Sequence, residues 1–220
     1  MEDIKLSKAG EHIHIEGFPD AVAVVALVGP KSRRLADLAL HEADLAFANE
    51  CLDCINHVPE EPHSIREGLW RSAIIHYMKC FGTSARFQLA AESIYKKESP
   101  QALENYRYFK ALRNKHFVHD ENSYAQGNPG AILNDGTKPY KVEKIVCSIV
   151  LAETLEQDAY ANLKLLISHA LVWVIAEFDA LCIQLTAELE AKSYEDLASM
   201  PTLTTDSPKL EEITTNRKAL

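Results

Sequence analysis

The stretch LKLLISHALVWVIAEFDALCIQL, residues 163–185, decides the fold class. Its apolar residues recur at three- and four-residue steps, the spacing of one face of an α-helix. The pattern predicts a helix from about residue 153 to residue 192. Forty residues would give ~60 Å of continuous helix, so we expect a kink or an extension beyond the core. The predicted apolar stripe consists of Leu163, Leu166, Ile167, Ala170, Val174, Phe178, Leu181 and Leu185.

Four further helices are predicted upstream. One starts near residue 31 and is stopped by VPEEPH, residues 58–63. The next starts near residue 63, where Ser64 and Glu67 have the spacing of a capping box. Its expected buried face holds Ile65, Leu69, Ala73, His76 and Cys80.

A short helix then ends near residue 97, and the fourth follows the sequence ESPQ, residues 98–101. Ser99 is a candidate N-cap there, with Pro100 at the first helical position. The fourth helix should carry the apolar residues Leu103, Tyr106, Phe109 and Leu112.

Short β-strands are expected beside these helices. HIHIE at 12–16 alternates, and AVAVVALVGP at 21–30 could be its hairpin partner or a lead-in to the first helix. Residues 121–140 are rich in Gly, Pro and Asn, which fits a loop or small hairpin, with NDG at 134–136 as a tight turn. YKVEKIVCSIV at 140–150 alternates well enough to be a strand that pairs with the N-terminal one.

The predicted fold is therefore mainly α: a helical bundle with a long C-terminal helix and a small β-hairpin or two-stranded addition. Residues 1–30 would form an N-terminal extension and residues 31–195 the α-helical domain. Residues 196–220 are polar and threonine-rich, and we expect a mobile tail.

Composition indicates an ordinary soluble globular protein, with 47% apolar and 25% charged residues. The net charge of −9 argues against a chain that coats DNA or an anionic membrane. Five scattered cysteines suggest reduced thiols in a cytoplasm. Because Glu2, Asp3 and Glu11 precede any apolar run, no N-terminal signal is expected, and Glu177 and Asp179 favour a buried last helix over a membrane span. The expected location is cytoplasmic.

Several familiar sites are incomplete in this sequence. Cys51, Cys54 and His57 lack a second pair of zinc ligands at a defined spacing, so packing thiols are the better interpretation. His41 has no second histidine four residues later, which a metalloprotease helix requires. No phosphate-binding glycine loop or serine nucleophile elbow is present.

The sequence LRNKHFVHDE, residues 112–121, holds the side chains that phosphodiester chemistry needs. Metal-independent RNA cleavage requires a base for the 2′-hydroxyl, an acid for the leaving oxygen and fixed positive charge for the transition state. Histidine titrates near neutral pH, and arginine can hold two phosphate oxygens. On an α-helix, Arg113 and His119 would be ~9 Å apart along the axis and ~120° apart around it, so one chain need not bring them together.

An alternative without catalysis stays open: the basic residues could simply form a solvated helix end, because basic residues in the last turn of a helix interact favourably with its dipole. Composition alone favours that solvated helix end. On a helix, His116 would share a face with Arg113, and Lys115 with His119.

The segment Arg113-Asn114-Lys115-His116-Phe117-Val118-His119 resembles the motif of HEPN domains: an arginine, a polar residue directly after it, and a histidine after an intervening stretch. Its place late in a helix, before a further long helix, is also typical of that family. Bacterial abortive-infection HEPN proteins are the most similar. The architecture would cover residues 31–190.

The resemblance implies a metal-independent endoribonuclease without a cofactor. It implies a homodimer in which the two motifs face each other in one composite cleft. His119 would be the general acid or base, Arg113 would hold the scissile phosphate, and Asn114 would orient the phosphate or the histidine. Lys115 and His116 would add positive charge for the RNA substrate.

The family also implies a toxin or phage-defence role, with an antitoxin or regulatory protein as a further partner. Members that a partner nucleotidyltransferase modifies carry a tyrosine two residues after the histidine, where this chain has Glu121. A different class of function is a non-catalytic HEPN-like module that binds nucleic acid or a protein partner. In a third, the chain is a helical interaction protein and the motif is only a helix end.

Overall fold

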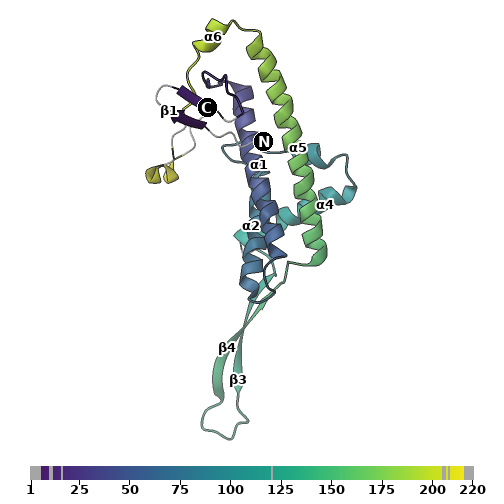
Figure 1. The fold of residues 1–220 in the computed structure, drawn as a ribbon. Coiled ribbons are helices and arrows are strands. Elements are labelled where there is room, and N and C mark those ends of the chain that lie inside the picture. The colour runs from purple at the N-terminus through teal and green to yellow at the C-terminus, as the bar shows by residue number, and fades with distance from the viewer. Residues whose placement is uncertain are drawn as a thin grey trace. The chain divides into compact units, whose positions relative to one another are not determined.

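The computed structural model describes residues 6–9, 12–15, 17–119, 121–204, 207 and 209–215, with side chains from Ile15 onward. The described chain is mainly helical, as expected (Figure 1). Its α-helices are α1 (Pro30–Ile55), α2 (His63–Lys79), α3 (Ala91–Tyr95), α4 (Pro100–Leu112), α5 (Gln157–Glu190) and α6 (Tyr194–Ala198). The other elements are the π-helix η1 (Arg113–Val118), the 3-10 helix η2 (Leu210–Thr214) and the strands β1 (Leu6–Ala9), β2 (His12–Ile15), β3 (Ala125–Leu133) and β4 (Val142–Leu151).

The long C-terminal helix is confirmed as α5, which spans 34 residues and begins four residues later than predicted. Six of the eight residues in its predicted stripe are buried, while Phe178 and Leu181 are half-buried. The buried six are Leu163, Leu166, Ile167, Ala170, Val174 and Leu185.

The start of α4 lies where predicted, with Ser99 at the N-cap position and Pro100 in the first turn, but the Ser99 side chain makes no capping hydrogen bond. The capping box proposed for Ser64 is wrong. Helix α2 already begins at His63, after Pro62 in an extended conformation, and no side chain caps it. Its buried face is centred on Trp70, Ile74 and Tyr77, and Ile65 is exposed, because burying the large aromatic rings removes more apolar area from water.

The N-terminal strand is confirmed as β2, but it pairs with β1, with Leu6 opposite Ile15. Residues 21–28 are not its partner. Within them, Ala26 N–H donates to the Pro201 carbonyl at 2.7 Å and Leu203 N–H donates to Val24 at 2.8 Å. Part of the C-terminal segment is thus hydrogen-bonded, and the expected mobility of residues 196–220 stays a prediction.

The strand expected at 140–150 is confirmed as β4, but its predicted partner is wrong. It pairs antiparallel with β3, from Ala125 opposite Leu151 to Leu133 opposite Val142. Residues 134–141 return the chain directly, with Gly136 at φ +81° donating its N–H to Asn134 Oδ1 at 2.9 Å. The short loop closes a local pair at a lower entropic cost than a distant strand would require.

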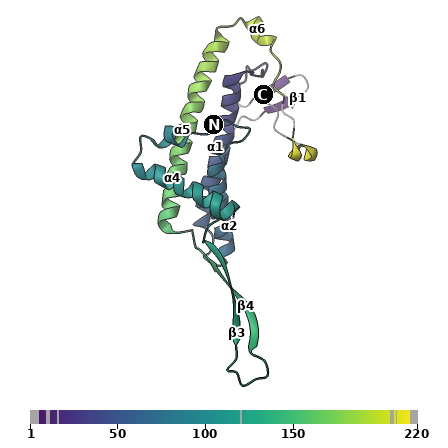
Figure 2. The same cartoon turned by 180° about the vertical axis from the view of Figure 1, so that it is seen from behind.

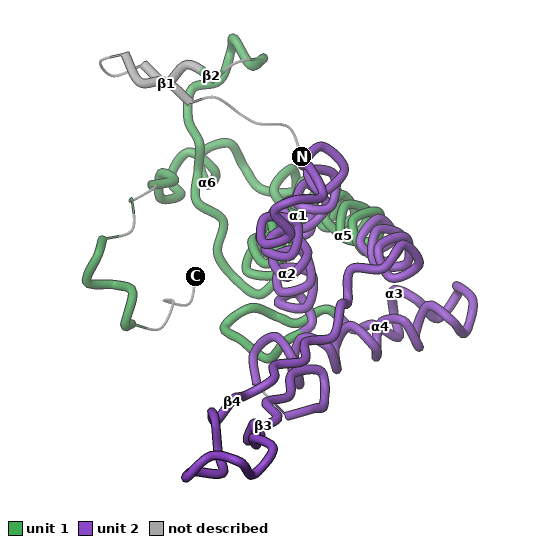
Figure 3. Tube along the Cα trace, turned by 90° about the horizontal axis from the view of Figure 1, so that it is seen from below, with its two compact units in different colours: residues 1–44, 82–89, 170–220 green, residues 45–81, 90–169 purple. Residues whose placement is uncertain are grey.

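The chain divides into two compact units (Figure 3). One holds residues 1–44, 82–89 and 170–220, and the other holds residues 45–81 and 90–169, so both α1 and α5 contribute to each. The second unit contains the predicted motif.

The first unit contains a polar cluster on α1. His41 Nε2 lies 2.9 Å from the Phe87 carbonyl, and Asp37 Oδ2 accepts the Phe87 N–H at 3.0 Å. Arg86 donates to Asp44 Oδ2 at 2.5 Å. These bonds hold residues 86–87 on α1 and satisfy polar groups that are buried.

The second unit is built around aromatic side chains. The Trp70 ring meets Phe109 edge-on at 6.0 Å, and Trp70 Nε1 donates to Thr154 Oγ1 at 3.1 Å. Tyr95 O–H donates to the Leu166 carbonyl at 3.0 Å, and its oxygen lies 2.8 Å from that of Tyr77. Because the Tyr95 proton is donated to the Leu166 carbonyl, Tyr77 is the donor in this pair. Burial raises the pKa of Tyr77, so its hydroxyl stays protonated.

Among the described residues, α5 alone is long and apolar enough to cross a membrane by length and composition. Of the 18-residue stretch of α5 that meets this criterion, 22% is buried in this structure. Core helices of soluble proteins meet the same criterion, so the structure is compatible with a soluble protein.

Candidate functional site

The predicted motif begins where α4 ends, and a buried face of α4 fixes that end. Tyr106, Phe109 and Leu112 are buried, and both α4 and η1 pack against α2. From Arg113 to Val118 the chain continues as a π-helix. Such wide turns are rare and often occur at functional sites.

The α-helical geometry expected for the motif is therefore wrong. A π-turn is wider than an α-turn, and His119 has left the helix with φ −124° and ψ 147°. The ~9 Å and ~120° between Arg113 and His119 do not apply, nor does the shared α-helical face of Lys115 and His119. The Lys115 carbonyl instead accepts the Glu121 N–H at 2.9 Å, which closes the turn. Asp120 lies outside the described residues.

Arg113 and Asn114 are brought together. Arg113 Nη1 donates to Asn114 Oδ1 at 2.8 Å, and both side chains are half-buried. Among the described residues no carboxylate pairs with Arg113, so its positive charge is not neutralised by an ion pair. The bond occupies the amide oxygen of Asn114 and leaves its NH₂ group as a donor.

His116 is half-buried between aromatic rings. Its centroid lies 5.2 Å from that of Phe117 and 5.4 Å from that of Tyr124, which it meets edge-on. The Nδ1 atom is buried, and no described group hydrogen-bonds to it. An unsatisfied buried ring nitrogen is costly unless a ligand or solvent meets it.

Lys115 and His119 are exposed. No hydrogen bond or ion pair in the described part of the chain joins either residue to Arg113. One copy therefore presents the arginine, the amide and the two histidines on one turn, without joining Arg113 to His119.

Two side chains that sequence reasoning did not assign, Arg71 and Tyr124, also contact the turn. Arg71 of α2 lies over the Phe117 ring, with Cζ 4.9 Å from the centroid. It also pairs with Glu67 at 2.6 Å. The i to i+4 spacing of Glu67 and Arg71 could have predicted this ion pair. No local pattern places Arg71 or Tyr124 beside the motif, since both arrive through the tertiary fold.

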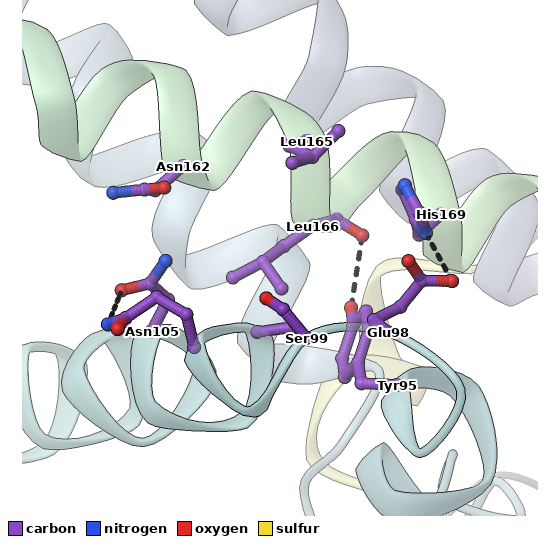
Figure 4. Close-up of a pocket in the computed structure, with 10 residues that line it drawn as sticks. Tyr95, Glu98, Ser99, Asn105, Asn162, Leu165, Leu166 and His169 are labelled. Carbon is purple, nitrogen blue, oxygen red and sulfur yellow. Dashed lines mark hydrogen bonds and ion pairs between the residues drawn. The ribbon is translucent and has the colours of Figure 1, made fainter.

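Two pockets in the same unit do not contain the predicted site. One of about 200 Å³ lies between the start of α4 and α5 (Figure 4). Its His169 Nδ1 pairs with Glu98 at 3.1 Å, and its other polar groups are mainly amides. The second, of about 500 Å³, reaches Tyr124 but also holds Glu153 and Glu156, which would repel a phosphodiester.

No group of three or more His, Cys, Asp or Glu side chains in the described ranges could hold a metal ion. The five cysteines form no disulfide, and Cys54 and Cys147 are exposed.

Comparison with protein-family models, with curated proteins and with solved structures finds no match. The function must therefore be inferred from the residues themselves.

Proposed function

We propose that this protein is a metal-independent endoribonuclease of the HEPN type, with an active site completed by a second copy of the chain. The observation that carries the proposal is the turn itself. A half-buried Arg113, which has no carboxylate partner in the described part of the chain, bonds to Asn114, and the exposed His119 follows the same turn.

Each side chain has a role in this proposal. Arg113 holds two oxygens of the scissile phosphate, and the free NH₂ of Asn114 donates to the phosphate. Lys115 and His116 add positive charge and donors around the RNA backbone. The acidic remainder of the chain repels RNA elsewhere and confines binding to this turn.

The reaction needs one base and one acid. The base takes the proton of the RNA 2′-hydroxyl, and O2′ attacks phosphorus. The bond from phosphorus to O5′ breaks, and the acid protonates the departing oxygen, which leaves a 2′,3′-cyclic phosphate. With one His119 per chain, two copies supply both roles, which is the chemical reason for a homodimer.

The biological setting follows from the same proposal. A nuclease without further cofactors would act on cytoplasmic RNA as a toxin or phage-defence effector, restrained by an antitoxin or another regulatory protein.

The test is cleavage of end-labelled RNA in the presence of EDTA. His119→Ala and Arg113→Ala should each reduce the rate by at least ~100-fold while the fold is retained. His63→Ala and Arg107→Ala are matched controls, because both side chains are exposed on other helical turns and should leave the rate unchanged.

The products should carry 2′,3′-cyclic phosphate ends. Cleavage that survives both motif substitutions would refute the proposal. RNA binding without cleavage by the unaltered protein would replace it with the non-catalytic module.

A further inference from the structure

The β3–β4 hairpin, which we call the ribbon, extends from the helices of its own unit as two strands (Figures 1 and 2). Every side chain of β4 is exposed, as is every side chain of β3 after Ala125. An isolated two-stranded ribbon is marginally stable in water. One with many apolar side chains needs a surface to cover it.

The two faces of the ribbon differ in chemistry. Side chains alternate between faces along a strand, and the register assigns them. A Cβ on Gly127 would lie 3.7 Å from Cys147 Sγ and one on Gly130 would lie 3.8 Å from Val146, which places these pairs on opposite faces. The apolar face comprises Ala125, Gly127, Pro129, Ala131, Ile145, Cys147, Ile149 and Leu151. The mixed face comprises Gln126, Asn128, Gly130, Ile132, Lys144, Val146, Ser148 and Val150.

The eight residues of the apolar face carry no charge, and Glu143, which precedes them at the β-bulge, is paired with Lys138. The side chains of the face form two stripes, one on each strand, that differ in size. Its β3 stripe holds only small or compact residues, whereas its β4 stripe is dominated by Ile145, Ile149 and Leu151. Ile149 is 72% exposed because Gly127, directly opposite, offers nothing to cover it. On the mixed face Val150, opposite Gln126, is 53% exposed.

The apolar face exposes three large aliphatic side chains: Ile145, Ile149 and Leu151 are 69%, 72% and 67% exposed. The other exposed large apolar side chains of the hairpin lie on the mixed face, at the bulge or in the loop, and do not belong to this surface. The apolar face is therefore smaller than the ~800 Å² that each partner buries in a standard complex, and the ribbon forms an interface at the small end of the range.

We propose that the partner is a second copy of this chain, packed apolar face to apolar face about a two-fold axis that runs along the ribbons. This axis places the large β4 side chains of each copy over the small β3 residues of the other copy. The two surfaces are therefore self-complementary. An axis across the ribbons would set isoleucine on isoleucine and leave glycine facing glycine, with voids between them. The eight residues of the face carry no charge and Glu143 beside them is neutralised by Lys138, so two chains of net charge −9 meet there without repulsion between these side chains.

The ribbon dimer also determines where the two copies of His119 lie, an inference that rests on the proposed function. Both ribbons run in the same direction, so the bases of both hairpins lie at the same end of the dimer. Each η1 ends seven residues before its β3 strand begins. The ribbon dimer therefore brings two copies of His119 to one end, where a composite site needs them.

The test is the mass of the full-length protein in solution, measured by sedimentation equilibrium. Ile149→Lys should raise the dimer dissociation constant at least ~100-fold, because it buries a charge at the centre of the interface. Val150→Lys is the matched control: the adjacent β-branched residue, also exposed, receives the same charge on the mixed face and should leave the dimer intact. A monomeric unaltered protein, or equal effects of both substitutions, would overturn the proposal.

A separate measurement tests whether the two-fold axis runs along the ribbons. A spin label at Thr137→Cys in the ribbon loop reports the distance between the two tips, in a variant with Cys54 and Cys182 replaced by serine and Cys147 replaced by alanine, which keeps the apolar face apolar. Ribbons running in the same direction place the labels about 10–20 Å apart, since stacked sheets lie ~10 Å apart. A separation above ~30 Å, the length of a strand of this size, would contradict this axis.

The outcomes separate the two proposals. Monomeric Ile149→Lys protein that still cleaves RNA would leave the ribbon dimer standing and refute the composite site. A ribbon dimer that does not cleave RNA would refute only the nuclease.

Discussion

Arg113 Nη1 donates a 2.8 Å hydrogen bond to Oδ1 of Asn114, the next residue in the chain. The bond fixes the amide with its NH₂ group free and leaves the guanidinium without a carboxylate partner among the described residues. The Arg113 guanidinium and the Asn114 NH₂ group are thus two hydrogen-bond donors held side by side. Such a pair suits an anionic group with several oxygens.

Asn114→Asp should weaken RNA cleavage at its binding step. The carboxylate keeps an acceptor for Arg113 but neutralises its charge and removes the NH₂ donors. We expect KM to rise by ~10-fold or more, measured by initial rates at low salt. Asn105→Asp on α4 is the control, because its side-chain oxygen likewise accepts a bond, from Gln101. An unchanged KM for Asn114→Asp would exclude Asn114 from the phosphate site.

Tyr95→Phe should destabilise the unit that holds the motif. The substitution removes the second donor to the Leu166 carbonyl, which keeps its bond within α5, and removes the acceptor for Tyr77, so the buried Tyr77 hydroxyl loses its partner. The free energy of unfolding should fall by about 1–3 kcal/mol in urea denaturation. Tyr140→Phe, in the exposed ribbon loop, should change it little. Equal stability of the two variants would show that the buried tyrosine pair does not stabilise the fold.

His41 should make the protein less stable in mild acid. Burial, together with the nearby Arg86 and Arg34, lowers the pKa of His41, opposed by the Phe87 carbonyl and Asp37. The unfolded chain therefore takes up a proton near pH ~6.5 while the folded chain does not. The associated stability is present above that pH and is lost as the pH falls through the folded pKa.

The measurement is urea denaturation at about pH 7.5 and 5.5, a window above most carboxylate pKa values. Unaltered protein should lose more stability between these conditions than His41→Gln, which keeps a donor for the Phe87 carbonyl. The same loss in both proteins would mean that His41 does not contribute.

Local patterns predict much of this fold. The apolar stripe of α5 and the Ser99-Pro100 start of α4 involve residues within a few positions of each other, where periodicity and capping chemistry operate directly. The partner of β4 could not be found that way. β3 has the sequence AQGNPGAIL, whose glycines and proline indicate a loop, and it becomes a strand through its pairing with a strong β-former.

The motif likewise has features that the local sequence predicts and features that only the tertiary fold determines. Its residue types are visible in the sequence, but the π-turn at Arg113–Val118 has no signature in three- and four-residue periodicity. Tyr124 reaches His116 only because the chain turns back after His119, and Arg71 reaches Phe117 from another helix. Such neighbours depend on tertiary packing, which a single sequence does not encode at short range.

The most direct test of the composite site is subunit exchange between unaltered protein and His119→Ala protein, mixed in equal amounts. The His119→Ala protein alone should be inactive, and a mixed dimer should be inactive too, because it holds only one of the two histidines that serve as base and acid. Since only a quarter of the exchanged dimers carry two copies of His119, the rate per mole of total dimer should fall to about a quarter of the unaltered rate. A rate of about half, in a mixture shown to contain heterodimers, would mean that each chain works independently and would contradict a site shared between two chains.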